Sequence, residues 1–162
     1  MKKIIGFLIC TMFSCTLIAQ TQLRKVYDEN INPMEQIDQA VTQAKHNNKF
    51  VLCQVGGNWC IWCLRFANFV TTDSDIAKII KDNYVYIHVN YSSQVKNNAN
   101  TLAMLKRLDY PTRFGFPVLV VINADGKVIH IQDSSFLEEG QGYNKNKVVR
   151  FLSLWTPKAV NQ

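Results

Sequence analysis

The chain has 162 residues, of which 48% are hydrophobic and 19% are charged. This length and composition fit one globular domain and leave little room for a second. With 7 Gly, 4 Pro and 5 Cys, the composition excludes a collagen-like chain, a disordered chain and a small scaffold held together by many disulfides. The net charge of +6 comes from basic residues scattered along the sequence, so it gives no support to nucleic-acid binding.

Residues 1–19 have the layout of a secretory signal peptide. A basic start at Lys2 is followed by an apolar stretch over residues 4–13, then by the small polar Ser14 and by Ala19 near the expected cut. We expect cleavage after Ala19, and therefore an exported, periplasmic protein with no transmembrane segment in the mature chain. Two alternatives stay open: a lipid attached at Cys15, and an uncleaved anchor, for which the apolar run is short of the roughly 20 residues of a spanning helix.

The remaining sequence alternates helix and strand patterns. We expect residues 20–31 to form an N-terminal extension, residues 32–157 one domain and residues 158–162 a C-terminal tail. Helical spacing of apolar residues predicts helices at residues 33–46, 60–70, 75–81, 101–108 and 147–155. Short apolar or β-branched runs predict strands at residues 50–55, 84–89, 118–122 and 128–131, the last two as a hairpin.

This order of elements predicts an α/β fold, with a central mixed sheet covered by helices on both faces. Residues 133–146 form the longest connection between predicted elements. We expect them to be a solvated loop, with a partner-specific surface as the alternative.

Three cysteines, Cys53, Cys60 and Cys63, lie outside the predicted signal peptide. In an oxidising compartment an odd number indicates one bystander thiol and one pair, or a link between molecules. Cys60 and Cys63 form a C-x-x-C motif that follows a predicted strand and a Gly–Gly turn and opens a predicted helix. Cys53 lies in the middle of that strand, where we expect a buried and inert thiol.

The start of a helix suits redox chemistry for two reasons. Residues three apart on a helix have Cβ atoms about 5–6 Å apart, so a small adjustment in the first turn brings them to the ~3.8 Å of a disulfide. The unpaired N–H groups and the helix dipole also favour a thiolate on Cys60. Cys63 lies one turn deeper and stays protonated. We therefore predict that Cys60 is the nucleophile and that Cys63 resolves the mixed disulfide.

The run GNWCIWC at residues 57–63, with FGFPV at residues 114–118, resembles the thioredoxin superfamily, especially its exported bacterial members. The resemblance covers roughly residues 32–155 and implies a thioredoxin-like fold. It also implies a cis peptide bond before Pro117, held against the two cysteines. The backbone of Phe116 would then bind an extended peptide substrate. We expect Trp59 and Trp62, the neighbours of the cysteines, to shape the rim that receives this substrate, with a place in the core as the alternative.

The sequence departs from the family pattern at two places. Many members have a buried Asp six residues before the first Cys, which helps the resolving thiol to lose its proton, whereas this chain has Gln54. The dipeptide between the cysteines is Ile61-Trp62, neither the Gly-Pro of reductive thioredoxins nor the Pro-His of strong oxidants. Reduction potentials of such pairs range from about −270 to −120 mV. The dipeptide leaves the direction open, and we favour a reductase or isomerase over an oxidase.

Other uses of the pair are a structural disulfide, half of a zinc site or a copper(I) site. Structural zinc needs four ligands, and the sequence offers no second C-x-x-C, while His46, His88 and His130 are isolated. Copper(I) prefers soft thiolates, but Met-rich or His-rich surroundings are missing.

We therefore predict an exported thiol:disulfide oxidoreductase without metal or organic cofactor. Its partners would be exported proteins with thiols or disulfides and a separate redox protein that resets the pair. The alternative is a non-catalytic thioredoxin-fold module that binds peptide or metal and has a structural disulfide.

Overall fold

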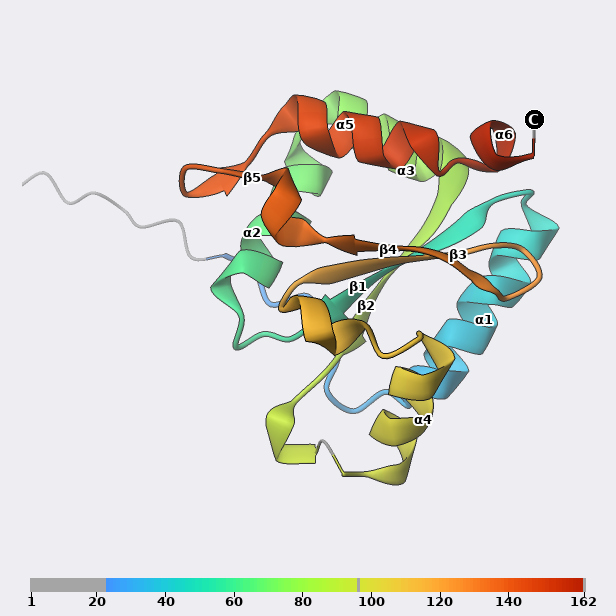
Figure 1. Cartoon of the computed structure of the whole chain (residues 1–162), viewed down its shortest axis with the longest axis vertical. Coiled ribbons are helices and arrows are strands. Elements are labelled where there is room, and N and C mark those ends of the chain that lie inside the picture. Colours follow the sequence, from blue (N-terminus) through green and yellow to red (C-terminus); the bar gives the residue numbers. More distant parts are fainter. Residues whose placement is uncertain (1–22, 96, 162) are drawn as a thin grey trace, which may run out of the picture.

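The computed structural model of the chain describes residues 23–95 and 97–161 (Figure 1). The predicted signal peptide, residues 1–19, and the alternative lipid site at Cys15 lie outside these residues. Within the described part of the chain, no helix has the length and apolar character needed to cross a membrane.

A four-stranded mixed sheet lies at the centre of the molecule, in the order β2-β1-β3-β4. The strands are β1 (Phe50–Gly56), β2 (Tyr84–Asn90), β3 (Val118–Ile122) and β4 (Val128–Asp133). β1 pairs in parallel with β2 and antiparallel with β3, which pairs antiparallel with β4. Every residue of β1 and β3 is buried, because both faces of these central strands are covered by helices.

Helices cover the two faces of this sheet (Figure 1). One layer packs on the strand residues Leu52 and Leu119, and contains α2 (Ile61–Thr72), α3 (Ser74–Asn83) and α5 (Lys145–Leu154). The other layer packs on Val51, Cys53 and Val55, and contains α1 (Pro33–His46) and α4 (Ala99–Arg107). The predicted mixed sheet with helices on both faces is confirmed.

The start of α1 shows how local sequence signals set an element. Asn32 precedes the helix and its side chain accepts a hydrogen bond from the Met34 N–H at 3.0 Å, while Pro33 takes the first helical position. The Glu35 carboxylate accepts from the Asn32 side-chain amide at 3.1 Å. The predicted helix over residues 33–46 is confirmed at both ends.

Several boundaries differ from the prediction. α2 begins at Ile61 and Cys60 is its N-cap, so Cys60 is not itself helical. α4 begins at Ala99 and not at residue 101, because Asn98 caps it. A short helix that was not predicted, α6 (Pro157–Val160), follows α5. Among the described residues, short 3-10 turns at Ser93–Val95, Pro111–Phe114 and Ser134–Leu137 join the elements.

The prediction of a solvated loop at residues 133–146 was wrong. This segment contains a 3-10 turn and a small hairpin of β5 (Glu138–Glu139) and β6 (Gly142–Tyr143). Tyr143 is buried and packs edge-on against Phe66 of α2, with ring centres 4.9 Å apart. Strands of two residues carry no periodicity in the sequence, so burial of Tyr143 against another element is what orders them.

Candidate redox site

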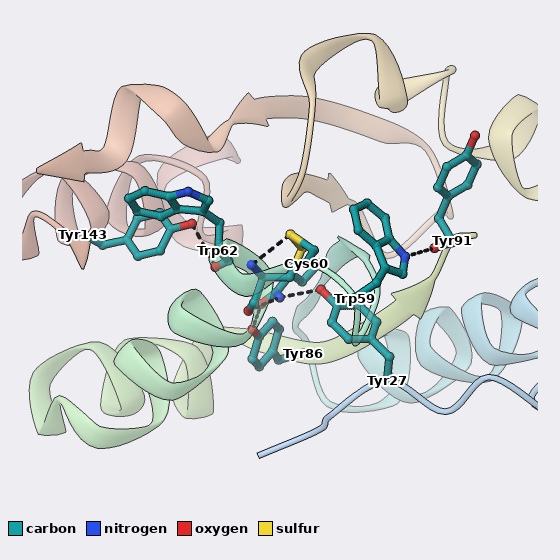
Figure 2. The surroundings of a disulfide bond; sticks show 9 residues. Tyr27, Trp59, Cys60, Trp62, Tyr86, Tyr91 and Tyr143 are labelled. Carbon is teal, nitrogen blue, oxygen red and sulfur yellow. Dashed lines mark hydrogen bonds between the residues drawn. A yellow bond between two sulfur atoms is a disulfide. The ribbon is translucent and has the colours of Figure 1, made fainter. Parts of the chain in front are cut away.

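Cys60 and Cys63 form a disulfide at the start of α2, with Cα atoms 5.2 Å apart (Figure 2). The Cys63 N–H donates a hydrogen bond to the Cys60 sulfur at 3.1 Å. Cys60 is 7% exposed, whereas Cys63 is fully buried. Of the two cysteines Cys60 is thus the more exposed, and its sulfur accepts one of the N–H groups of the helix start that have no partner within the helix.

The turn before Cys60 depends on small residues. A Cβ atom at Gly56 would overlap the Cys63 sulfur, and one at Gly57 would overlap the Trp59 indole. The Gly57 carbonyl accepts a hydrogen bond from the Cys60 N–H at 3.0 Å. Strand β1 can therefore run directly beneath the disulfide, because its last residue has no side chain there.

Trp59 lies beside the disulfide and is 57% exposed. Its indole N–H donates to the Tyr91 carbonyl at 2.9 Å, and its ring meets Phe116 edge-on at 5.2 Å. Phe116 in turn stacks on Tyr91 at 5.1 Å. These three aromatic residues, with Glu29, line a groove of about 490 Å³. Tyr91 was not predicted as part of the site, because it follows β2 and is remote from both motifs in sequence.

The FGFPV and C-x-x-C motifs meet in space. The Phe116–Pro117 peptide bond is cis, which is the geometry that the resemblance implies. The Phe116 side chain packs against the buried cluster that contains Cys60 and Cys63. Pro117 is buried at the beginning of β3.

Trp62 lies on the opposite side of the disulfide from Trp59 (Figure 2). Its half-buried ring meets Tyr143 edge-on at 5.8 Å, and the Arg65 guanidinium lies 4.9 Å from its centre. The Tyr143 hydroxyl donates to the Trp62 carbonyl at 3.1 Å. Trp62 therefore belongs partly to the core beneath α2, whereas Trp59 forms an exposed side of the aromatic groove.

A buried hydrogen-bond network involves the Cys63 carbonyl, and Figure 2 labels two of its members, Tyr27 and Tyr86. Gln54 is fully buried, and its amide nitrogen donates to the Cys63 carbonyl at 2.9 Å and to the Tyr27 hydroxyl at 2.5 Å. Its amide oxygen accepts from the Tyr86 hydroxyl. Burial raises the pKa of both tyrosines above the ordinary value. The position where many family members have a carboxylate is therefore occupied by a neutral, satisfied amide.

The other candidates are separate from the disulfide. Cys53 is buried as predicted, on the face of β1 that packs against α1 and α4, and burial raises the pKa of its thiol. His46, His88 and His130 lie on α1, β2 and β4. Over residues 23–95 and 97–161, no three His, Cys, Asp or Glu side chains are grouped to hold a metal ion.

Comparison with known proteins is consistent with this geometry. The family model Thioredox_DsbH, described as "Protein of unknown function, DUF255", matches residues 17–156. The thiol:disulfide interchange protein DsbD of Escherichia coli (strain K12) is 27% identical over 115 residues, which cover 71% of this chain and 19% of that protein. DsbD of Shigella boydii serotype 4 is 26% identical over the same share. The chain thus spans about a fifth of the length of these relatives.

Solved structures share the fold. The disulphide isomerase from Xylella fastidiosa Temecula1 superimposes with a TM-score of 0.68 at 23% identity, over 82% of this chain and 97% of that one. A thioredoxin from Thermus thermophilus gives a TM-score of 0.53 at 15% identity, over 77% and 88% of the two chains. The predicted thioredoxin-like fold is confirmed. The chain belongs to the Thioredox_DsbH family and has the thioredoxin-like fold.

Proposed function

We propose that this protein is an exported thiol:disulfide oxidoreductase that acts on protein substrates through Cys60 and Cys63. The observation that carries the proposal is the placement of the pair at the N-terminus of a helix and beside an aromatic groove, with Cys60 slightly exposed (7%) and Cys63 fully buried. A structural disulfide between residues three apart closes a very short loop and adds only about 2 kcal/mol by the chain-entropy model. A disulfide that served only to stabilise the fold would not need an exposed aromatic groove beside it.

The reaction begins with the reduced pair. The Cys60 thiolate, stabilised by the Cys63 N–H and the helix dipole, attacks one sulfur of a substrate disulfide. That disulfide breaks, and its other sulfur leaves as a thiolate that takes a proton from water. Cys63 then loses its proton and attacks the Cys60 sulfur, which forms the Cys60–Cys63 disulfide and releases the substrate's second thiol. Two electrons pass from the pair to the substrate.

The aromatic groove supplies the substrate site. Trp59 and Phe116 offer apolar surface next to the Cys60 sulfur, and Glu29 adds a carboxylate at the rim. An extended peptide would form strand-like hydrogen bonds with the backbone of Phe116, just before the cis bond to Pro117. Trp62 would limit the opposite side of the site.

The direction that we propose is that of a reductase or isomerase, since the relatives carry the names of interchange and isomerase proteins. The sulfurs themselves carry the electrons, so the reaction as proposed uses no metal or organic cofactor. Its partners would be exported proteins with thiols or disulfides, and a second redox protein would return electrons to the Cys60–Cys63 disulfide. The layout of residues 1–19 supports export to the periplasm.

Insulin reduction by the pre-reduced protein tests the function. We expect turnover by the wild-type protein, none by Cys60→Ser, and wild-type turnover by Cys53→Ala, the matched control in which the buried thiol is removed. Equal turnover by wild type and Cys60→Ser would reject the enzymatic function in favour of a binding module with a structural disulfide. A titration of the pair in glutathione buffers gives its potential and hence the direction of electron flow.

A further inference from the structure

We propose that Tyr27 is a positioning residue for the resolving cysteine, and that its hydroxyl donates a hydrogen bond to the Cys63 sulfur when this sulfur is a thiolate. The inference rests on the proposed function and assigns a residue to its second step. Tyr27 lies outside both sequence motifs, on the segment that precedes α1, and is 5% exposed.

The orientation of the Gln54 amide fixes the proton of Tyr27. A carbonyl can only accept, so the group that faces the Cys63 carbonyl must be the amide nitrogen of Gln54. The second N–H of the same nitrogen points at the Tyr27 hydroxyl, 2.5 Å away. The Tyr86 hydroxyl donates to the amide oxygen and holds the amide in this orientation. Tyr27 is therefore an acceptor toward Gln54, and its own O–H proton is directed elsewhere.

The Cys63 sulfur lies on the same side of β1 as this hydroxyl. A Cβ atom built on Gly56 would stand 2.9 Å from the Tyr27 oxygen and would overlap the Cys63 sulfur. Tyr27, Cys60, Cys63 and Leu64 form one buried cluster. A disulfide sulfur is a weak acceptor, whereas a thiolate is a charged one and forms a stronger, charge-assisted bond. The hydroxyl thus gains its acceptor when Cys63 ionises.

The buried titratable side chains around this site, Tyr86, His88 and Tyr143, are neutral at pH 7. Tyr86 and His88 face it from β2, and Tyr143 faces it from β6. Burial raises the pKa of Tyr86 and Tyr143 and lowers that of His88 to about 4. Glu29, on the segment of Tyr27, is exposed, and its carboxylate accepts from the Asn58 amide at 3.2 Å. The Tyr27 hydroxyl would therefore stabilise a buried Cys63 thiolate as a neutral hydrogen-bond donor and not as a positive charge.

In the step concerned, the Cys63 thiol gives its proton to water and the resulting thiolate attacks the Cys60 sulfur. The bond between Cys60 and the substrate sulfur breaks, and that sulfur leaves with the electron pair and takes up a proton. Tyr27 keeps its own proton throughout, because its raised pKa makes it a donor and not a base. Its hydrogen bond increases the fraction of Cys63 present as thiolate before the attack.

The two steps can be separated with a chromogenic aromatic disulfide, which releases a coloured thiolate when Cys60 attacks it and a second one when Cys63 resolves the adduct. In Tyr27→Phe we expect the pH midpoint of the second release to move up by about one unit. At pH 7 this shift leaves about tenfold less of Cys63 as thiolate. A thiolate with a higher pKa is also more nucleophilic, which offsets part of the loss, so the second release should slow about threefold. The first release should be unchanged.

Tyr84→Phe is the matched control, since it also removes a buried tyrosine hydroxyl, one that donates to the Leu152 carbonyl at 2.6 Å. It should leave both releases as in wild type. If Tyr27→Phe does not fold, a ring-fluorinated tyrosine at position 27 tests the same bond, because its more acidic hydroxyl should move the second midpoint downward.

The outcomes are distinct. A wild-type protein that releases no coloured thiolate contradicts the proposed function itself. A normal first release, together with a second release whose pH midpoint is the same in wild type, Tyr27→Phe and the fluorinated protein, overturns the assignment of Tyr27 and leaves the oxidoreductase function in place.

Discussion

Asn58 and Tyr27 are joined by a reciprocal pair of hydrogen bonds. The Tyr27 N–H donates to the Asn58 side-chain oxygen at 3.1 Å, and the Asn58 side-chain N–H donates to the Tyr27 carbonyl at 2.8 Å. The same oxygen accepts from the Val26 N–H at 3.1 Å. One side chain thereby pairs with the backbone as a neighbouring strand would, and fixes the segment before α1 to the turn that carries Cys60.

Replacing Asn58 by Ala should therefore loosen that segment. Loss of these bonds leaves backbone groups without partners, so we expect the free energy of unfolding to fall by about 1–3 kcal/mol. Limited trypsin digestion should cut faster after Lys25, which is exposed. Asn68→Ala, at an exposed position of α2, is the control. A cleavage rate equal in wild type and Asn58→Ala would contradict this account of the contact.

Gly56 should tolerate no side chain. A Cβ atom there would overlap the Cys63 sulfur and stand 2.9 Å from the Tyr27 hydroxyl, so Gly56→Ala should destabilise the oxidised protein by about 1–3 kcal/mol. Gly142→Ala is the control, because no atom lies within 4 Å of its added Cβ. Urea denaturation of the two variants should show a loss for the first alone.

Alkylation of the fully reduced protein should follow exposure. Cys60 is 7% exposed, whereas Cys63 and Cys53 are fully buried, and the helix start favours a thiolate on Cys60. Iodoacetamide at pH 6–7 should therefore modify Cys60 well before the other two, as seen by peptide mass mapping. Earlier labelling of Cys63 would reverse the order of attack proposed above.

Stability should fall below neutral pH because of His88. Burial lowers its pKa to about 4 in the folded protein, so between pH 6.5 and 4 the unfolded chain binds the extra proton. Stability therefore rises with pH through this window and is lost as the pH falls, by about 2–3 kcal/mol for this group. His88→Phe keeps a ring against Tyr27 and Tyr86 and should flatten this part of the urea-denaturation profile. Asn68→Ala, at an exposed position of α2, should leave the profile unchanged.

The Trp59→Ala variant should show whether Trp59 contributes to peptide binding or to the reaction at the Cys60 sulfur. The exposed indole forms a wall of the groove, so its loss should lower kcat/KM for a disulfide-containing peptide about tenfold. The rate with a small chromogenic disulfide should change little. Leu102→Ala, which removes a side chain of similar exposure from α4, serves as the control. Equal losses with both substrates would assign Trp59 to the chemistry and not to the groove.

Local patterns in the sequence were sufficient for the fold. The cap at Asn32 with Pro33 placed α1, and the apolar runs placed β1 and β3, because helix starts and buried strands depend on neighbours along the chain. The same reasoning placed Cys60 and Cys63 together at the start of a helix, with an error of one residue in where that helix begins.

The surroundings of the disulfide were decided by tertiary structure. Tyr27 and Tyr86 reach Gln54 across 27 and 32 residues of sequence, and Tyr91 meets Phe116 from another strand end. Periodicity tells which face of a strand a residue occupies, but not which side chain from elsewhere meets it there. The sequence by itself therefore determined the sheet and the C-x-x-C pair at the start of a helix. Only the folded chain decided that a neutral network of Gln54 and two tyrosines lies beneath Cys63, because the bonds of that network join segments that become neighbours through packing.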